Sequence, residues 1–142
     1  MKRTSFATAE CPVARSVEAV GDWWALLIVR DAFIGKKRFG EFQTSLGVAK
    51  NILTVRLKKL VADGVLELVP ASDGSAFKEY ALTGKGRGLL PVIAALGQWG
   101  GARSEFKLVD RKKGKAVRLE FRSEDGRRLA PDEVQLVPES GA

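Results

Sequence analysis

Positions 36–64 of the chain read KKRFGEFQTSLGVAKNILTVRLKKLVADG, and this stretch decides the fold. Apolar residues recur every three or four positions on both sides of Gly47, which predicts one helix over about 38–46 and a second over about 49–63. Gly47 would make the tight turn between them, and Gly64 would end the second helix. Two short helices joined in this way are typical of a helix-turn-helix.

A hairpin is predicted directly after this helix pair. The runs VLELVP (65–70) and FKEYAL (77–82) alternate apolar and polar residues around a turn at 73–75, as antiparallel strands do. Ahead of the pair, the sequence predicts helices over about 12–20 and 23–33, the second capped by Asp22. We therefore expect an α+β chain that is mainly α, a winged helix-turn-helix whose wing is the hairpin.

The excess positive charge lies in the same helix pair. Seven Lys or Arg and one acid, Glu41, lie between positions 36 and 59, whereas the whole chain of 142 residues carries +7. Neutralising phosphates supplies most of the sequence-independent affinity of a protein for duplex DNA. Double-stranded DNA is therefore the expected partner of this face.

The C-terminal part is predicted to contain one long helix and a small β appendage. Thr83 can cap a helix through about Arg103 with an apolar stripe interrupted by Pro91, and such a stripe suggests a partner chain. Trp24 and Trp99 are expected in the core. Strand-like runs at 115–122 and 133–137 flank a turn at 124–126. We assign 1–104 to a DNA-binding and dimerisation domain and 105–142 to a C-terminal β-hairpin appendage.

The composition argues against several other classes of protein. The chain has no histidine and one cysteine, Cys11, so it lacks the usual zinc ligands and the commonest general acid or base. It contains neither a nucleophile elbow nor a phosphate-binding glycine loop. No apolar run approaches the roughly 20 residues of a membrane span, and the N-terminus has no signal-peptide pattern. We expect a cytoplasmic protein that is not an enzyme and has neither a metal nor a cofactor.

Three segments resemble the HxlR-type winged-helix transcriptional regulators, relatives of the MarR regulators. They are CPVARSVEAVGDWWALLIVRD (11–31), KRFGEFQTSLGVAKNILTVRLKKLVADGVLELVP (37–70) and YALTGKGRGLLPVIAALGQWG (80–100). The resemblance implies a DNA-binding homodimer joined through its first and last helices. It also implies that a cysteine just before the first helix, here Cys11, can sense oxidants or electrophiles. One departure is Ala49, which stands where the family commonly has a capping serine.

The second helix of the pair is the expected reader of the DNA sequence. Asn can pair with adenine edges, Thr with a base or a phosphate, Val with a thymine methyl group, and Lys with guanine or phosphate. The alternative is a solvated helix face, which is common for Lys and Thr, but the turn, the wing and the localised charge favour DNA. The outward positions are Lys50, Asn51, Thr54, Val55 and Lys58.

Lys36, Lys37 and Arg38 are expected to anchor the protein on the DNA backbone. They precede the first helix of the pair, where exposed amides and the positive helix end would add to the attraction for a phosphate.

Two further candidates carry open alternatives. Lys78 is the only cation of the wing, and Asp73 at the wing tip argues against strong minor-groove contact, whereas family wings usually carry arginine. Arg56 lies off the outward row of its helix, so it either contacts a phosphate or pairs with Asp63.

Cys11 also has two interpretations. At the N-cap ahead of Pro12, the helix dipole and Arg15 would favour a thiolate that can be oxidised or alkylated. The alternative is a small, half-buried packing residue, since free cysteine is among the most buried residue types.

Together these features predict a sequence-specific transcriptional regulator, in the simplest case a repressor, that binds a palindromic operator as a dimer under redox or electrophile control at Cys11. One alternative is a ligand-responsive regulator with a structural cysteine, its small-molecule effector lodged near the dimer seam. The other is a winged-helix module that binds an acidic protein.

Overall fold

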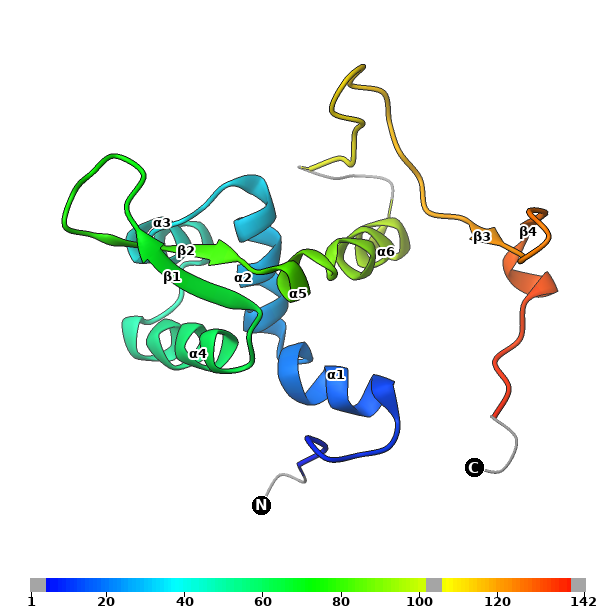
Figure 1. Cartoon of the computed structure of the whole chain (residues 1–142), viewed down its shortest axis with the longest axis horizontal. Coiled ribbons are helices and arrows are strands. Elements are labelled where there is room, and N and C mark those ends of the chain that lie inside the picture. The colour runs from blue at the N-terminus through cyan, green and yellow to red at the C-terminus, as the bar shows by residue number, and fades with distance from the viewer. Residues whose placement is uncertain (1–4, 102–105, 139–142) are drawn as a thin grey trace. The chain divides into compact units, whose positions relative to one another are not determined.

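The computed structural model describes residues 5–101 and 106–138 (Figure 1). Contacts divide the chain into two compact units, one ending at Ile93 and the other beginning at Ala94.

The N-terminal unit has the predicted helices and wing, each within one or two residues of its expected bounds. No helix of the described residues is long and apolar enough to cross a membrane. The elements up to the wing are α1 (Pro12–Val20), α2 (Trp23–Ile34), α3 (Phe39–Leu46), α4 (Lys50–Ala62), β1 (Leu66–Pro70) and β2 (Lys78–Leu82).

The ends of these helices follow from single residues. The Asp22 carboxylate accepts from the amides of Trp24 and Ala25 at 2.9 and 3.2 Å and so caps α2. Gly47 has a φ of 62°, a left-handed conformation that turns the chain from α3 into α4. Ala49 precedes α4 without a side-chain cap, as predicted. A serine cap there would contribute about 1 kcal/mol to stability, and because α4 lacks it, packing has to hold the helix.

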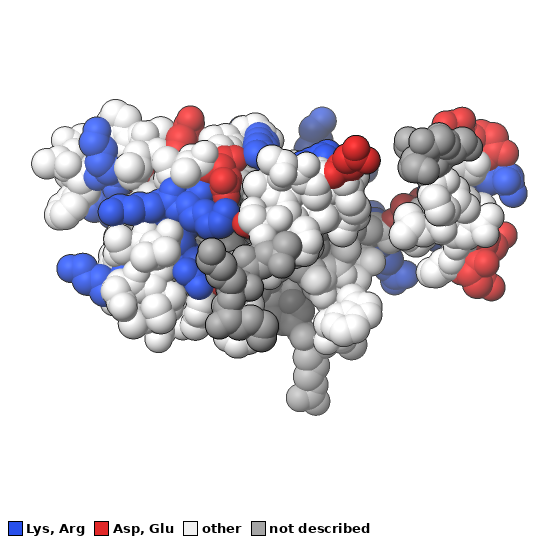
Figure 2. Space-filling model, turned by 90° about the horizontal axis from the view of Figure 1, so that it is seen from below, with Lys and Arg blue, Asp and Glu red and all other residues white. Residues whose placement is uncertain are grey.

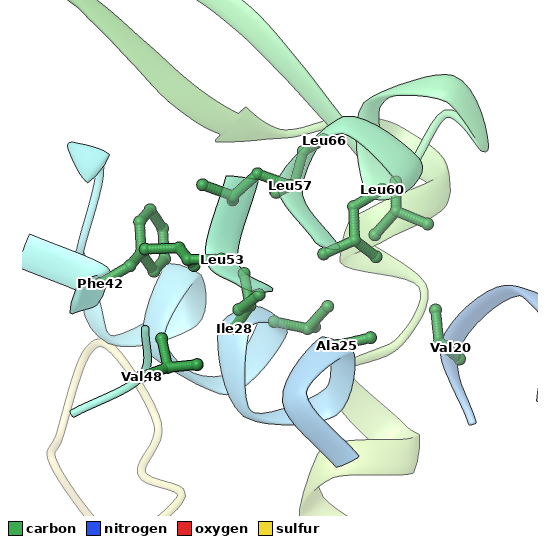
Figure 3. Close-up of a cluster of buried hydrophobic side chains, with 11 residues drawn as sticks. Val20, Ala25, Ile28, Phe42, Val48, Leu53, Leu57, Leu60 and Leu66 are labelled. Carbon is green, nitrogen blue, oxygen red and sulfur yellow. The ribbon is translucent and has the colours of Figure 1, made fainter. Parts of the chain in front are cut away.

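One apolar cluster fixes the angle between α3 and α4 (Figure 3). Phe42 of α3 is fully buried and meets the Tyr80 ring of β2 edge to face, with ring centroids 6.3 Å apart. Helices α2, α3 and α4 and strand β1 all contribute to this cluster, so the helix pair packs on one common core. The largest buried apolar side chains are Ile28, Val29, Phe42, Leu53, Leu57, Leu60, Val65 and Leu66.

The wing is an antiparallel hairpin joined to the start of α3. Its register pairs Leu66 with Leu82 and Pro70 with Lys78. The Tyr80 amide donates to the Lys37 carbonyl at 2.7 Å, which places the residues ahead of α3 beside β2.

The predicted long terminal helix is two helices. Helix α5 (Gly84–Arg87) is capped by the Thr83 hydroxyl, and α6 (Leu90–Gly100) begins after a break. Pro91 lacks the amide that would bond to the Arg87 carbonyl, so the helix cannot continue, whereas proline is accepted in the first turn of a new one. The predicted end at Arg103 lies outside the described residues.

The predictions for two tryptophans had different outcomes. Trp24 packs against the core as expected. Trp99 on α6 is 88% exposed, so the prediction that it is buried in the core of this chain is wrong. Leu89 and Ile93 of the same apolar stripe pack against the core, whereas Leu90, Leu96 and Trp99 are exposed.

The C-terminal unit has two tight turns. An isolated bridge joins Val109 to Ala116, and β3 (Phe121–Arg122) pairs with β4 (Arg128–Leu129) around the predicted turn. The prediction of a strand over 133–137 was wrong, because Pro131–Glu133 form a 3-10 turn and residues 134–138 have no strand partner among the described residues. Of the run 115–122, only 121–122 form a strand.

Candidate nucleic-acid interface

The outer face of α4 carries four exposed side chains from the predicted set. Lys50, Asn51, Val55 and Lys58 point away from the buried row of the same helix. Figure 2 shows Lys and Arg side chains gathered at the left of the view, where α4 and the wing lie in Figure 1. This helix therefore offers cations, one amide and one apolar group on a single convex face.

Thr54 lies on the same face but has limited hydrogen-bonding capacity. It is half-buried, and its hydroxyl donates to the Lys50 carbonyl at 2.8 Å. With its hydrogen engaged inside the helix, the oxygen can accept a hydrogen bond from a base amine but cannot donate to a phosphate.

Arg56 is part of the scaffold, though not through the predicted partner. Its Nε lies 3.1 Å from the Asp22 carboxylate, while Asp63 pairs with Lys59 at 2.6 Å. Burial raises the pKa of Asp22, but Arg56 and the two capped amides outweigh it, and the pKa is lowered overall. Because Asp22 also caps α2, the ion pair joins the start of α2 to the middle of α4.

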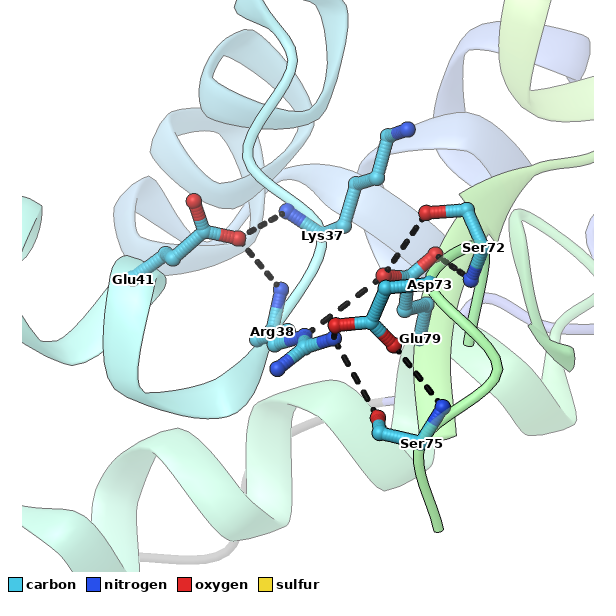
Figure 4. A network of polar contacts seen from close by, with 7 residues as sticks. All are labelled: Lys37, Arg38, Glu41, Ser72, Asp73, Ser75 and Glu79. Carbon is cyan, nitrogen blue, oxygen red and sulfur yellow. Dashed lines mark hydrogen bonds and ion pairs between the residues drawn. The ribbon is translucent and has the colours of Figure 1, made fainter. Parts of the chain in front are cut away.

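The amides at the start of α3 are partly occupied. The Glu41 carboxylate accepts from the amides of Lys37 and Arg38, both at 3.0 Å (Figure 4). These two bonds lower the pKa of Glu41. These two amides are therefore not free for a phosphate, and the expected attraction at this helix end stays a prediction that depends more on the lysine side chains.

Arg38 is held by the wing. Its Nη2 lies 2.6 Å from Asp73 Oδ2 and donates to Ser75 Oγ at 3.4 Å (Figure 4). Its Nε lies 3.5 Å from Glu79, and the guanidinium carbon lies 5.3 Å from the Phe77 ring centroid. These contacts connect the start of α3 to the turn of the wing and to its second strand, β2.

Charge in this network is largely neutralised. Hydrogen bonds from Ser75 and then from Arg38 lower the pKa of Asp73 from 3.8 to about 2. The hydrogen bond that Arg38 donates to the Asp73 carboxylate raises the pKa of Arg38. Glu79 is buried and also accepts from the Ser72 amide at 3.1 Å. The sequence places Asp73 at the wing tip but gives no sign of its pairing with Arg38, because 35 positions separate the two residues.

Several predicted cations remain unpaired. Among the described residues, Lys37, Lys50, Lys58 and Lys78 are exposed and have no ion-pair partner. Lys36 is half-buried beside Glu41, where it also lowers the pKa of that carboxyl. The unpaired positive charge of the predicted set is thus on α4, before α3 and at the first residue of β2.

Cys11 is exposed and precedes α1 as its N-cap residue. Within this chain the Cys11 side chain is therefore not half-buried, as the packing alternative expected, and its role as a sensor stays a prediction. The Arg15 guanidinium donates to the carbonyls of Ala9 and Glu10 at 2.6 and 2.9 Å, directly before the cysteine.

A family model described as HxlR-like helix-turn-helix matches residues 19–108, which include the helix pair, the wing and α6. The chain belongs to the HxlR-like helix-turn-helix family. The family resemblance drawn from the sequence is thereby confirmed.

Relatives of this HxlR-like chain are named as regulators rather than as enzymes. It is 44% identical over 88 residues to the uncharacterised HTH-type transcriptional regulator Rv3095 of Mycobacterium tuberculosis, covering 62% of this chain and 56% of the relative. The chain thus spans about half the length of the curated relatives it matches first.

Two solved structures support the same fold. The crystal structure of PA1607, a candidate transcription factor, has a TM-score of 0.83 and 50% identity and covers 96% of this chain and 100% of that one. The redox regulator HypR in its oxidised form has a TM-score of 0.59 and 30% identity, covering 68% of this chain and 100% of its own.

Proposed function

We propose that this HxlR-like chain is a cytoplasmic, sequence-specific DNA-binding transcriptional regulator, and that α4 reads the major groove. The observation that carries the proposal is the exposed row on α4, two unpaired lysines with Asn51 and Val55 between them. Bidentate amide contacts to adenine, apolar contact with a thymine methyl group, and lysine contacts to guanine or phosphate are the chemistry of direct readout.

We further propose that the regulator is a homodimer that represses by occluding a promoter. Exposed apolar residues support a partner chain, namely Val13 and Val17 on α1 and Leu96 and Trp99 on α6. Two copies of α4 would enter successive major grooves about 34 Å apart on a palindromic site.

The test is fluorescence anisotropy across a salt series. Binding to the DNA upstream of the protein's own coding region is compared with binding to a scrambled duplex of the same length. A preference for the upstream site with a steep salt dependence is expected, because each neutralised phosphate adds about 0.9 to the logarithmic slope. Equal and weak binding to both duplexes would contradict operator recognition in that region and favour an acidic protein as the partner.

Exposure of Cys11 ahead of α1 supports control by oxidation or electrophiles at that thiol. Because the described chain holds one thiol, oxidation would give an intersubunit disulfide or a mixed disulfide. We expect oxidant to weaken operator binding of the wild type and to leave Cys11→Ser unchanged. If both respond alike, or neither responds, Cys11 is not the switch, and a small-molecule effector becomes the better explanation.

Asp73→Asn is expected to tighten DNA binding by about threefold to tenfold and to raise the logarithmic salt slope by about 0.9. It removes the carboxylate 2.6 Å from Arg38 and leaves only the longer 3.5 Å contact with Glu79, so that the guanidinium can neutralise one more phosphate. Lowering the pH does not have the same effect as this substitution. Since the pKa of the Asp73 carboxyl is lowered to about 2, its ion pair with Arg38 is fully present above the ordinary pKa of 3.8 and is lost only as the pH falls toward 2.

The matched control is Glu67→Gln, which removes one exposed acid from β1. It separates release of Arg38 from a general change in net charge. Weaker binding by Asp73→Asn would show instead that the ion pair positions the wing for DNA.

A further inference from the structure

The C-terminal unit contains a second concentration of positive charge that the proposed reader does not include. Six Lys or Arg and one acid lie between positions 107 and 118. We call this segment the basic hairpin. Together with positions 36–59 it holds 13 of the 24 cations of the chain but 2 of its 17 acids. Outside these two segments the chain carries a net negative charge.

The basic hairpin has a defined backbone (yellow to gold in Figure 1). Its arms are joined by the Val109 and Ala116 bridge and by a hydrogen bond from the Val117 amide to the Leu108 carbonyl at 2.9 Å. Gly114, with a φ of 68°, closes the turn and donates to the Asp110 carbonyl at 2.9 Å. The cations are thus carried by an ordered turn.

Asp110, the one acid of the hairpin, has a structural role. Its carboxylate accepts from the amides of Lys112 and Lys113 at 2.8 and 2.7 Å, which bends the chain at the tip. The carboxylate makes no ion pair with a cation of the hairpin. Three consecutive cations, Arg111, Lys112 and Lys113, therefore project from the turn with little compensation.

The rest of the same unit shows the opposite arrangement. Arg122 pairs with Glu120 at 2.7 Å, Arg127 with Asp125 at 2.9 Å, and Arg128 with Glu120 at 2.9 Å. All six cations of the basic hairpin are exposed, and none has an ion-pair partner within residues 5–101 and 106–138. A run of like charge is usually a solvated face, but here one half of a small unit is neutralised and the other half is left positive.

We propose that the basic hairpin is a second DNA-binding element that contacts the phosphate backbone. This inference rests on the proposed function of the chain. Cations on an exposed turn, without an amide or apolar group aligned for base edges, suit positioning contacts rather than sequence readout. The hairpin should therefore add affinity and salt dependence equally on operator and scrambled duplexes, whereas α4 supplies the preference between them.

The test compares two triple variants of the full chain by anisotropy across a salt series. Arg111→Gln, Lys112→Gln and Lys113→Gln are combined in the first, and Arg122→Gln, Arg127→Gln and Arg128→Gln in the matched control. Both remove three positive charges from the same unit. We expect the first to weaken binding to both duplexes at least about tenfold and to lower the logarithmic salt slope by about 2 to 3, while the control changes little.

The outcomes separate this inference from the proposed function. If the wild type prefers its operator but the hairpin variant binds with an unchanged slope, the hairpin makes no phosphate contact and the regulator function stands. An equal effect of both variants would mean that the hairpin acts only through the net charge of the chain, and would contradict the inference. Both variants are also tested for binding to phosphatidylserine vesicles. If the hairpin variant loses binding to the vesicles but not to either duplex, the partner is a membrane surface and the inference is overturned. Circular dichroism of both variants confirms that the fold is retained.

Discussion

Combining Lys50→Glu with Lys58→Glu is expected to abolish operator binding, with a loss of at least about a hundredfold. Both side chains are exposed and unpaired on the outer face of α4, so each substitution replaces an attraction for a phosphate or a guanine with a repulsion. The logarithmic salt slope should fall by about 2, since two phosphates lose their partners. Anisotropy across the salt series measures both quantities.

Stability should hardly change in this variant, because exposed positions away from caps and networks usually alter the free energy of unfolding by less than about 0.5 kcal/mol. The matched control is Arg127→Glu with Arg128→Glu, which changes the net charge equally at cations that pair with Asp125 and Glu120. If the α4 variant still binds its operator as the wild type does, α4 is not the reader. If it keeps DNA binding but loses an acidic protein partner, the interaction-module alternative is correct.

The local elements of the N-terminal unit could be predicted because their signals are short in range. Gly47 and Gly64 mark helix ends through the left-handed φ that glycine accepts, and the cap at Asp22 lies within three residues of the amides it binds. The apolar repeat of α4 identified its buried face correctly at Leu53, Leu57 and Leu60. Periodicity therefore also identified the outward row.

The predictions that were wrong depend on contacts between residues that lie far apart in the sequence. Arg56 pairs with Asp22 across two helices, whereas helical spacing suggested Asp63. Trp99 was assigned to the core because it continues an apolar stripe, yet a stripe does not show whether its own chain or another covers it.

The candidate site was predicted in part for the same reason. The residues of α4 follow from one helix, but the pairing of Arg38 with Asp73 requires the wing to fold back on the start of α3. The excess of Lys and Arg in the basic hairpin can be counted in the sequence. Only the pairing of Arg122, Arg127 and Arg128 in the same unit distinguished it from an ordinary solvated segment.

Phe42→Ala is expected to lower the free energy of unfolding by about 3 to 5 kcal/mol, the usual cost of truncating a buried phenylalanine. Phe42 is fully buried in the core cluster to which α2 and α4 also contribute, and its ring meets Tyr80 of the wing edge to face. The cavity would loosen the contact that sets α3 against α4. Denaturant unfolding at a fixed protein concentration measures the effect, because the stability of the proposed dimer would depend on concentration.

Phe121→Ala is the control, since that ring is 52% exposed on β3 and its loss should change the free energy of unfolding by less than about 0.5 kcal/mol. A cost below about 1 kcal/mol for Phe42→Ala would contradict the packing described for the helix pair. The Phe42 variant should lose operator binding in proportion to its unfolded fraction and recover it on cooling toward maximal stability, whereas the α4 charge reversal should stay folded and unbound. That difference separates residues that position α4 from residues that read DNA.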